Sequence, residues 1–301
     1  MGNFAKDNRG DALDAFMKLS RPSPHASSPE PEALLTFDAY APAQIAMRVR
    51  EVGVTKATMP VLTMFALAIL AGAFIALGSL FFTMTMTTGT TGQPPAFGLM
   101  RLAGGLTFSL GLILVVVGGA ELFTGNNLIA MAWASGRVTT QQVMRNWGWV
   151  YLGNLVGAVG TAVLVWLAGV HTMSDGAVGE TMVQIARSKI ALDPVSALAR
   201  GVLCNVLVCL AVWLCMGART VTDKILAIVF PITAFVACGF EHSVANMYFL
   251  AIGVALAAGT SVSLSVTGAL SNLALVTLGN VLGGTVLVAL VYWSVYLRNS
   301  D

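Results

Sequence analysis

Two glutamates and one histidine are the residues of this chain whose surroundings point to chemistry. Glu121 and Glu241 lie inside long apolar stretches, and His242 follows Glu241 directly. An ionisable side chain at the centre of a bilayer costs at least about 2.5–3.5 kcal/mol, so its presence there suggests a function. His242 can titrate near neutral pH, which makes it a candidate for moving a proton.

The two glutamates also have a structural explanation. Each is followed five residues later by an asparagine, Asn126 or Asn246. Carboxylates can accept hydrogen bonds from the backbone N–H groups that are freed where a helix is interrupted. We therefore predict that these four residues cap helix breaks rather than contact a substrate. Histidine has no advantage over Ser or Asn as a helix cap, so capping does not explain His242. The alternative to a functional role is that His242 is a core histidine whose hydrogen bonds are satisfied by the protein.

The other reactive residues do not form an enzyme's site. All four cysteines lie in apolar runs without a C-x-x-C pair: Cys204, Cys209, Cys215 and Cys238. We interpret them as small buried hydrophobic residues. The chain has no G-x-S-x-G, H-E-x-x-H or P-loop motif. We predict no catalytic residue, no metal ligand and no cofactor.

Composition places the glutamates and the histidine in a membrane. Apolar residues make up 56% of the 301 residues, and charged residues make up 10%, against roughly 25% in a typical soluble domain. The mean hydropathy is +0.80. A soluble enzyme is therefore excluded, and a net charge of +2 is too small for a nucleic-acid-binding protein.

Six apolar stretches must position these side chains. They run approximately over 60–83, 97–134, 147–170, 196–216, 225–260 and 272–297. The second stretch would form a helix of about 57 Å, whereas the hydrocarbon core is about 30 Å thick. Gly118, Gly119 and Gly125 lie inside it, and Pro231 and Gly239 lie inside the fifth stretch. We predict that both stretches are broken, which membranes tolerate only inside protein or along a watery path.

The two halves of the chain resemble each other. Leu-Gly-Asn-x-x-Gly occurs at 152–157 and again at 278–283, and the Glu–Asn pairs recur 120 residues apart. Three spans in each half require opposite orientations. Inverted repeats with broken helices in matching positions indicate a transport site near the middle of the membrane, and G-x-x-x-G spacing lets helices approach closely.

Charge divides the chain into three parts and orients it. Residues 1–36 are polar and rich in proline and serine, which predicts a disordered cytoplasmic tail. Residues 37–59 predict an amphipathic cytoplasmic helix, helical from about 42 to 58, and residues 60–298 form the six-span transport domain. Twelve of the 16 Lys and Arg residues fall on the side of the termini, so both termini are predicted to be cytoplasmic.

Four segments resemble the formate/nitrite transporter family: 119–126 (GAELFTGN), 203–213 (LCNVLVCLAVW), 239–247 (GFEHSVANM) and 276–280 (VTLGN). The similarity runs from about 42 to 298. It implies an all-α, aquaporin-like protomer of six transmembrane helices, in two inverted three-helix repeats with spans 2 and 5 broken. It also implies a homopentamer in a lipid bilayer, with one path per protomer for small monovalent anions, often moved with a proton.

The resemblance assigns roles to nine positions. His242 matches the family's central histidine, Thr124 its pore threonine, Asn205 its pore asparagine and Lys189 its vestibule lysine. The apolar constrictions correspond to Phe108, Leu112, Leu122, Val208 and Phe235. A lysine in a narrow mouth attracts anions, and a threonine and an asparagine offer hydrogen bonds at the centre.

The expected function is therefore proton-linked transport of formate through His242, in the inner membrane of a bacterium. His242 either donates the proton or only orients Thr124. Nitrite and hydrosulfide are the alternatives within the family. A neutral-solute channel of aquaporin type would need no titratable histidine, and a membrane-embedded enzyme or sensor would need more catalytic residues than two glutamates and a histidine.

Overall fold

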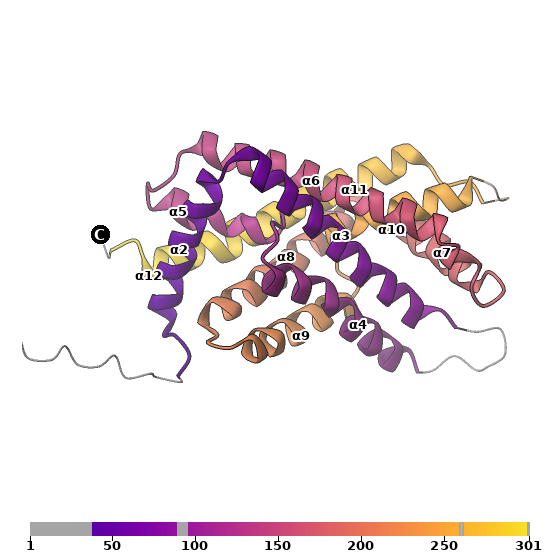
Figure 1. Ribbon diagram of the computed structural model, residues 1–301, viewed down its shortest axis with the longest axis horizontal. Coiled ribbons are helices and arrows are strands. Elements are labelled where there is room, and N and C mark those ends of the chain that lie inside the picture. The colour runs from indigo at the N-terminus through magenta and orange to yellow at the C-terminus, as the bar shows by residue number, and fades with distance from the viewer. Residues whose placement is uncertain (1–37, 89–95, 259, 261, 300–301) are drawn as a thin grey trace, which may run out of the picture. The chain divides into compact units, whose positions relative to one another are not determined.

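All regular structure in the described part of the chain is helical (Figure 1). The computed structural model describes residues 38–88, 96–258, 260 and 262–299, so the predicted tail over 1–36 lies outside the described residues. Within those ranges, five helices are long and apolar enough to cross a membrane. They are α3 (Val61–Met86), α4 (Phe97–Gly118), α6 (Thr140–Leu167), α8 (Pro194–Gly217) and Val266–Tyr296, which comprises α11 (Val266–Val281), η3 (Leu282–Leu290) and α12 (Val291–Tyr296).

Both over-long apolar stretches are interrupted, as predicted. The first continues after α4 as η1 (Gly125–Ile129) and α5 (Ala130–Ala134), and the second consists of α9 (Val221–Ala237) and α10 (Ser243–Ala257). Gly119 and Gly239 follow the two first half-helices with φ of 79° and 73°. Such a left-handed residue ends a helix, and glycine adopts it without steric cost.

Pro231 does not mark the break that the sequence suggested. It lies inside α9, which continues to Ala237. A proline removes one backbone N–H and bends a helix, whereas the positive φ of Gly239 redirects the chain. The glycine therefore ends the half-helix and the proline does not.

Two helices flank the interrupted ones. The predicted helix at 42–58 is α2 (Pro42–Thr58), and its buried face packs against η1, α5 and α8. A second flanking helix, α7 (Ala177–Ile190), was not predicted. Its buried residues Val178, Met182 and Ala186 recur every four positions, and α7 packs against α10. A short turn, η2 (Val170–Thr172), precedes it.

The packing of one half reproduces that of the other. In the first half α3 packs against α4 and α6, and in the second α8 packs against α9 and α11. Similarly, α2 lies against η1 and α5, while α7 lies against α10. The two halves meet where α4 packs along α9, and Figure 1 shows these two helices side by side.

The predicted close approach at the G-x-x-x-G motifs is confirmed. A Cβ atom on Gly157 would overlap the carbonyl of Ile69, and one on Gly283 would overlap the carbonyl of Val202. Glycine is therefore required for α6 to pack on α3, and for the helix that contains α11 to pack on α8, at these distances.

Candidate functional site

Asn154 holds the first break from the neighbouring helix α6. Its Oδ1 accepts a hydrogen bond from the backbone N–H of Phe123 at 2.9 Å. Its Nδ2 donates to the carbonyls of Ala68 and Glu121, at 2.8 and 2.9 Å. A buried backbone group without a partner is costly. This one side chain satisfies two groups of the break, the N–H of Phe123 and the carbonyl of Glu121, and also binds a carbonyl of α3.

Asn280 does the same at the second break. Its Oδ1 accepts from the N–H of Ser243 at 2.8 Å, and its Nδ2 donates to the carbonyls of Gly201 and Glu241 at 2.8 and 2.9 Å. Both asparagines are fully buried. The repeated Leu-Gly-Asn motif thus has a structural role: its asparagine ties a break to the helices around it.

Glu121 forms the centre of a buried polar cluster beside the first break. Its carboxylate accepts from Lys56 Nζ at 2.5 Å and from Asn126 Nδ2 at 2.7 Å. Asn126 also donates to Asn146 Oδ1, and Asn146 donates to the carbonyl of Lys56. The cluster therefore joins α2, the break and α6.

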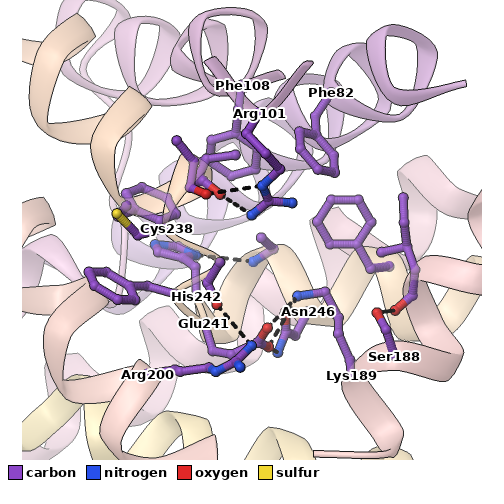
Figure 2. Close-up of a pocket in the computed structure, with 18 of the residues that line it drawn as sticks. Phe82, Arg101, Phe108, Ser188, Lys189, Arg200, Cys238, Glu241, His242 and Asn246 are labelled. Atoms are coloured by element: carbon purple, nitrogen blue, oxygen red, sulfur yellow. Dashed lines mark hydrogen bonds and ion pairs between the residues drawn. The ribbon is translucent and has the colours of Figure 1, made fainter. Parts of the chain in front are cut away.

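Glu241 forms a matching cluster beside the second break. Lys189 Nζ lies 3.0 and 3.1 Å from the two carboxylate oxygens, and Asn246 Nδ2 donates to Oε2 at 2.7 Å. Asn246 also donates to Asn272, and Asn272 donates to the carbonyl of Lys189. Figure 2 shows Lys189 and Asn246 converging on this carboxylate.

The prediction that Glu121, Glu241, Asn126 and Asn246 cap the half-helices needs correction. The contacts that these four residues make in the two clusters join side chain to side chain. The N-cap residue of α10 is instead His242. The physical reason is charge. A buried carboxylate needs an opposite charge, and a lysine on a flanking helix supplies it more fully than a helix end does.

His242 is both the cap of α10 and one side of the contact between the halves. Its Nδ1 accepts from the N–H of Ala245 at 3.1 Å, so the histidine has the capping role that the sequence did not assign to it. Its Nε2 lies 2.9 Å from Thr124 Oγ1, at the other break. The imidazole is buried and stacks on Phe235.

These two contacts define the form of the imidazole. Because Nδ1 accepts from Ala245, it carries no proton, and a neutral ring then carries its proton on Nε2. Nε2–H of His242 therefore donates to Thr124 Oγ1. The hydroxyl hydrogen of Thr124 is left to donate elsewhere, which makes Thr124 a hydrogen-bond donor at the meeting point of the breaks.

Asn205 lies beside Thr124, but its amide N–H groups already donate to acceptors of the protein. Its Nδ2 contacts the carbonyl of Thr124 at 3.2 Å, Asn127 Oδ1 at 2.8 Å and the carbonyl of Asn280 at 2.7 Å. Two hydrogens are thus shared among three acceptors. Asn205 Oδ1 has no hydrogen-bond partner among the described residues. The asparagine chiefly ties the two breaks together, and only its oxygen could serve a ligand.

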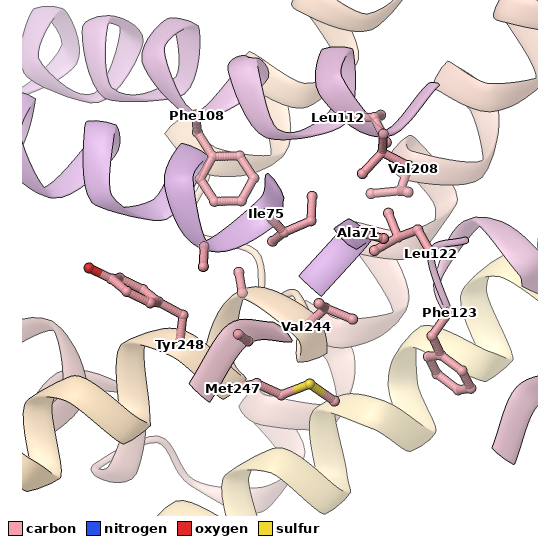
Figure 3. Packing of buried hydrophobic residues seen from close by; sticks show 14 of the residues in the cluster. Ala71, Ile75, Phe108, Leu112, Leu122, Phe123, Val208, Val244, Met247 and Tyr248 are labelled. Carbon is pink, nitrogen blue, oxygen red and sulfur yellow. The ribbon is translucent and has the colours of Figure 1, made fainter. Parts of the chain in front are cut away.

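The five predicted constriction residues belong to one apolar cluster: Phe108, Leu112, Leu122, Val208 and Phe235. Figure 3 shows the first four of them. Each is at most 3% exposed. The rings of Phe108 and Phe235 meet edge to face, with centroids 5.5 Å apart. We call these five residues the apolar layer. Phe235 of this layer stacks on His242, and so dry a layer opposes the passage of a bare ion.

A cavity of about 390 Å³ opens on one side of the apolar layer. Phe108, Phe235 and His242 line its inner end, and its charged lining residues are Arg101, Lys189, Arg200 and Glu241. Figure 2 shows Arg101 and Arg200 on opposite sides of His242 and Glu241. We call this space the cationic cavity. The sequence analysis predicted Lys189 there but neither arginine.

A smaller cavity of about 240 Å³ opens on the other side. Leu112 and Leu122 line it, and Lys56 and Glu121 are its charged lining residues. We call it the apolar cavity. The predicted constriction residues therefore separate two chambers, each with a Lys–Glu pair on its wall.

Comparison with known proteins identifies what this arrangement resembles. The family model described as "Formate/nitrite transporter" matches residues 43–294. A formate channel, FocA, of Escherichia coli strain K12 is 44% identical over 280 residues, covering 88% of this chain and 97% of the relative. A probable formate transporter of Methanothermobacter thermautotrophicus is 37% identical, covering 85% of this chain and 97% of the relative.

Two solved structures share the fold. A pentameric formate channel with formate bound matches with a TM-score of 0.70 and 39% identity, over 79% of this chain and 98% of that chain. A structure described as an FNT family ion channel matches with a TM-score of 0.73 and 31% identity, over 84% of this chain and 98% of that chain.

Proposed function

Because this chain belongs to the formate/nitrite transporter family, we propose that it carries small monovalent anions across a membrane, with formate as the main substrate and a proton as its companion. The similarity to formate channels over nearly their whole length supports formate. Family membership identifies a channel or transporter rather than an enzyme.

The observation that carries the proposal is the placement of one hydrogen-bonded pair between two chambers. His242 lines the cationic cavity, Leu122 lines the apolar cavity, and Thr124, at the first break, contacts His242, at the second break. An anion from either chamber meets the apolar layer first. There the hydroxyl of Thr124 can donate a hydrogen bond to the anion, whereas the oxygen of Asn205 can only accept one, from the O–H of the neutral acid.

Proton linkage follows from the cost of burying charge. A bare anion among Phe108, Leu112 and Phe235 loses its hydration, whereas the neutral acid loses far less. His242 can supply a proton only after taking up a second one, and that proton would break the cap on Ala245. The alternative is that His242 stays neutral and orients Thr124, with the proton arriving through water.

Six crossings suit the matched packing of the halves. In this topology α4 with η1 and α5 forms one broken span, and α9 with α10 forms the other, in an aquaporin-like protomer of two inverted repeats. Odd numbers of crossings in each half require the inversion. The excess of Lys and Arg near the termini supports a cytoplasmic location for both of them, and the bacterial formate channels support the inner membrane.

We also infer assembly into a homopentamer. The solved relative at 39% identity is described as pentameric. Large apolar side chains are exposed on the outside of the protomer, with Leu62, Phe97 and Phe230 each at least 75% exposed. Such faces are buried by lipid or by neighbouring copies.

Flux measurement in vesicles tests the proposed substrate. The purified protein is reconstituted, and uptake of formate, nitrite, hydrosulfide and lactate is compared across pH with the membrane current recorded in parallel. We expect formate uptake that is saturable and faster at acidic pH. Faster hydrosulfide or nitrite flux would reassign the substrate within the family, and equal passage of neutral solutes would contradict anion transport.

The His242–Thr124 pair has its own test. His242→Asn keeps a hydrogen-bonding side chain but cannot titrate near neutral pH. We expect it to lose proton-linked uptake, or to leak the anion as current. Thr124→Ser, which keeps the hydroxyl, serves as the control and should retain coupling. Unchanged proton coupling in His242→Asn would contradict the relay and support the orienting role.

A further inference from the structure

Two arginines reach the cationic cavity from different halves of the molecule. Arg101 belongs to α4 and Arg200 to α8, and both line the cavity. A Cβ atom placed on Gly239 would lie 3.3 Å from Arg101 Nη2 and 3.8 Å from Arg200 Nη1. The two guanidinium groups therefore converge on one point at the second break, directly before Glu241 and His242.

The charges of these arginines are not balanced within the cavity. Among the described lining residues, Glu241 is the single carboxylate, and it is engaged by Lys189 at 3.0 Å. Two positive charges thus face a chamber that narrows to an apolar layer. Like charges repel at such a separation, so the arrangement is stabilised when an anion lies between them.

Helix capping accounts for only part of the guanidinium donors. Arg101 donates through Nε to the carbonyl of Ala237 at 3.0 Å, and through Nη2 to the carbonyl of Val236. Arg200 donates to the carbonyl of Gly239 over a long 3.4 Å. A guanidinium has five N–H donors. Arg101 therefore keeps Nη1 for another acceptor, and Arg200 keeps Nε and Nη2.

We propose that Arg101 and Arg200 form an anion-binding subsite in the cationic cavity, selective for planar anions with two oxygens. This inference rests on the proposed function and narrows the substrate class to carboxylates and nitrite, without hydrosulfide. The planar N–H fork of arginine matches two oxygens at once, and a single sulfur atom cannot use both donors. The subsite loads the anion before it reaches His242.

Cys238 provides a reporter that does not depend on transport. It is exposed on the wall of the same cavity, whereas the other three cysteines, Cys204, Cys209 and Cys215, are buried. In detergent, the rate at which Cys238 reacts with an anionic methanethiosulfonate, divided by the rate with a cationic one, measures the local potential. Cys238→Ser shows the background.

The labelling experiment compares Arg200→Gln with Arg187→Gln. Arg200 makes one long hydrogen bond, so its removal leaves the fold intact. Arg187 is exposed on α7 and does not line the cavity. We expect Arg200→Gln to lower the rate ratio about threefold to fivefold at low salt, and Arg187→Gln to leave it unchanged. An equal ratio in Arg200→Gln and wild type would overturn the subsite.

Protection by sodium formate tests the selectivity. Formate and nitrite should slow the labelling of Cys238 in the wild type at lower concentrations than chloride does, and Arg200→Gln should need more formate. Chloride stands in for hydrosulfide as the single-atom anion, because hydrosulfide would consume the methanethiosulfonate reagent. Arg200→Lys keeps the charge without the planar fork and should lose the preference. Equal protection by all three anions would contradict selection by two oxygens.

The two proposals fail in distinguishable ways. Vesicles that carry formate while Cys238 labelling ignores both Arg200 and formate would overturn the subsite and leave the transport proposal standing. Vesicles that carry no formate, with labelling that still responds to formate and to Arg200, would overturn the transport proposal and retain the anion-binding subsite.

Discussion

The two breaks in this molecule are built alike and equipped differently. Around each glutamate the same contacts recur: a lysine from a flanking helix, an asparagine five residues later, and a second asparagine that returns to the backbone of the lysine. Lys56 and Lys189 both occupy the last turn of their flanking helices. The repeated part is therefore a scaffold that neutralises a buried carboxylate.

The differences lie where an anion would pass. The residue after Glu121 is Leu122, and the residue after Glu241 is His242. The apolar cavity has one Lys–Glu pair, whereas the cationic cavity has two arginines in addition. The contacts that repeat thus form the structural frame, whereas the residues that differ between the two breaks are those that an anion would meet. Comparing matched substitutions in the two halves separates effects on stability from effects on transport.

The largest effect is expected at the asparagines that fasten the breaks. Asn154→Leu and Asn280→Leu each leave two buried backbone groups of a break without partners and remove a further hydrogen bond to a neighbouring helix, which should cost about 3–6 kcal/mol. Thermal unfolding and size-exclusion profiles in detergent measure this loss. Similar losses in both halves would support a shared scaffold, and a wild-type melting temperature in either variant would contradict it.

An intermediate effect is expected at the ion pairs. Glu241→Gln leaves the ammonium of Lys189, whose side chain is 13% exposed, without its counter-charge, whereas Lys56 is 25% exposed. We expect a loss of about 2 kcal/mol for Glu241→Gln and less for Glu121→Gln, because water solvates Lys56 better.

A double-mutant cycle provides the control. Removing both charges with Glu241→Gln and Lys189→Met should restore part of the stability, because no buried charge is then left alone. Strictly additive losses would show that the pair contributes no coupling energy.

The smallest effect on stability is expected at Gly119 and Gly239, the glycines with positive φ that follow the first half-helices. Alanine at Gly119 meets no atom within 4 Å, so Gly119→Ala should cost only the backbone strain of about 1 kcal/mol. Gly239→Ala carries the same strain and also pushes on Arg101 Nη2, which would lie 3.3 Å from the new Cβ atom, whereas Arg200 Nη1 at 3.8 Å stays in ordinary van der Waals contact. We expect similar melting temperatures but slower formate uptake from the side of the cationic cavity for Gly239→Ala alone. Equal uptake in the two variants would show that the arginines at the second break do not contribute to transport.

Much of the frame could be predicted from the sequence. The approximate positions of the apolar helices, the breaks near Gly119 and Gly239 and the close packing at the G-x-x-x-G motifs follow from local properties, namely hydrophobic length and the conformational freedom of glycine. The bounds were less accurate: α6 begins at Thr140 and α11 at Val266, earlier than the predicted 147 and 272, because the caps Thr139 and Ser265 start these helices. Helix α7 was missed because it is short and follows a polar loop, although its buried residues recur at helical spacing.

The sequence named candidate site residues but few of their contacts. The resemblance offered an orienting contact of His242 with Thr124 as one alternative, and the structure places Nε2 of His242 2.9 Å from Oγ1 of Thr124, across 118 positions of sequence. Lys189 was predicted to attract anions, and its ion pair with Glu241 was not part of that prediction. No local signal distinguishes an arginine that faces a cavity from one at a membrane surface.

The sequence by itself determined that this chain lies in a membrane, that two of its helices are broken and that its halves repeat, because apolar length, glycine position and repeated motifs are properties of neighbouring residues. Only the tertiary structure decided how the charges are paired, which nitrogen of His242 accepts a hydrogen bond and where Arg101 and Arg200 converge. Hydrogen bonds and ion pairs depend on distances of about 3 Å between groups from different helices. Such distances arise only when the two halves fold against each other.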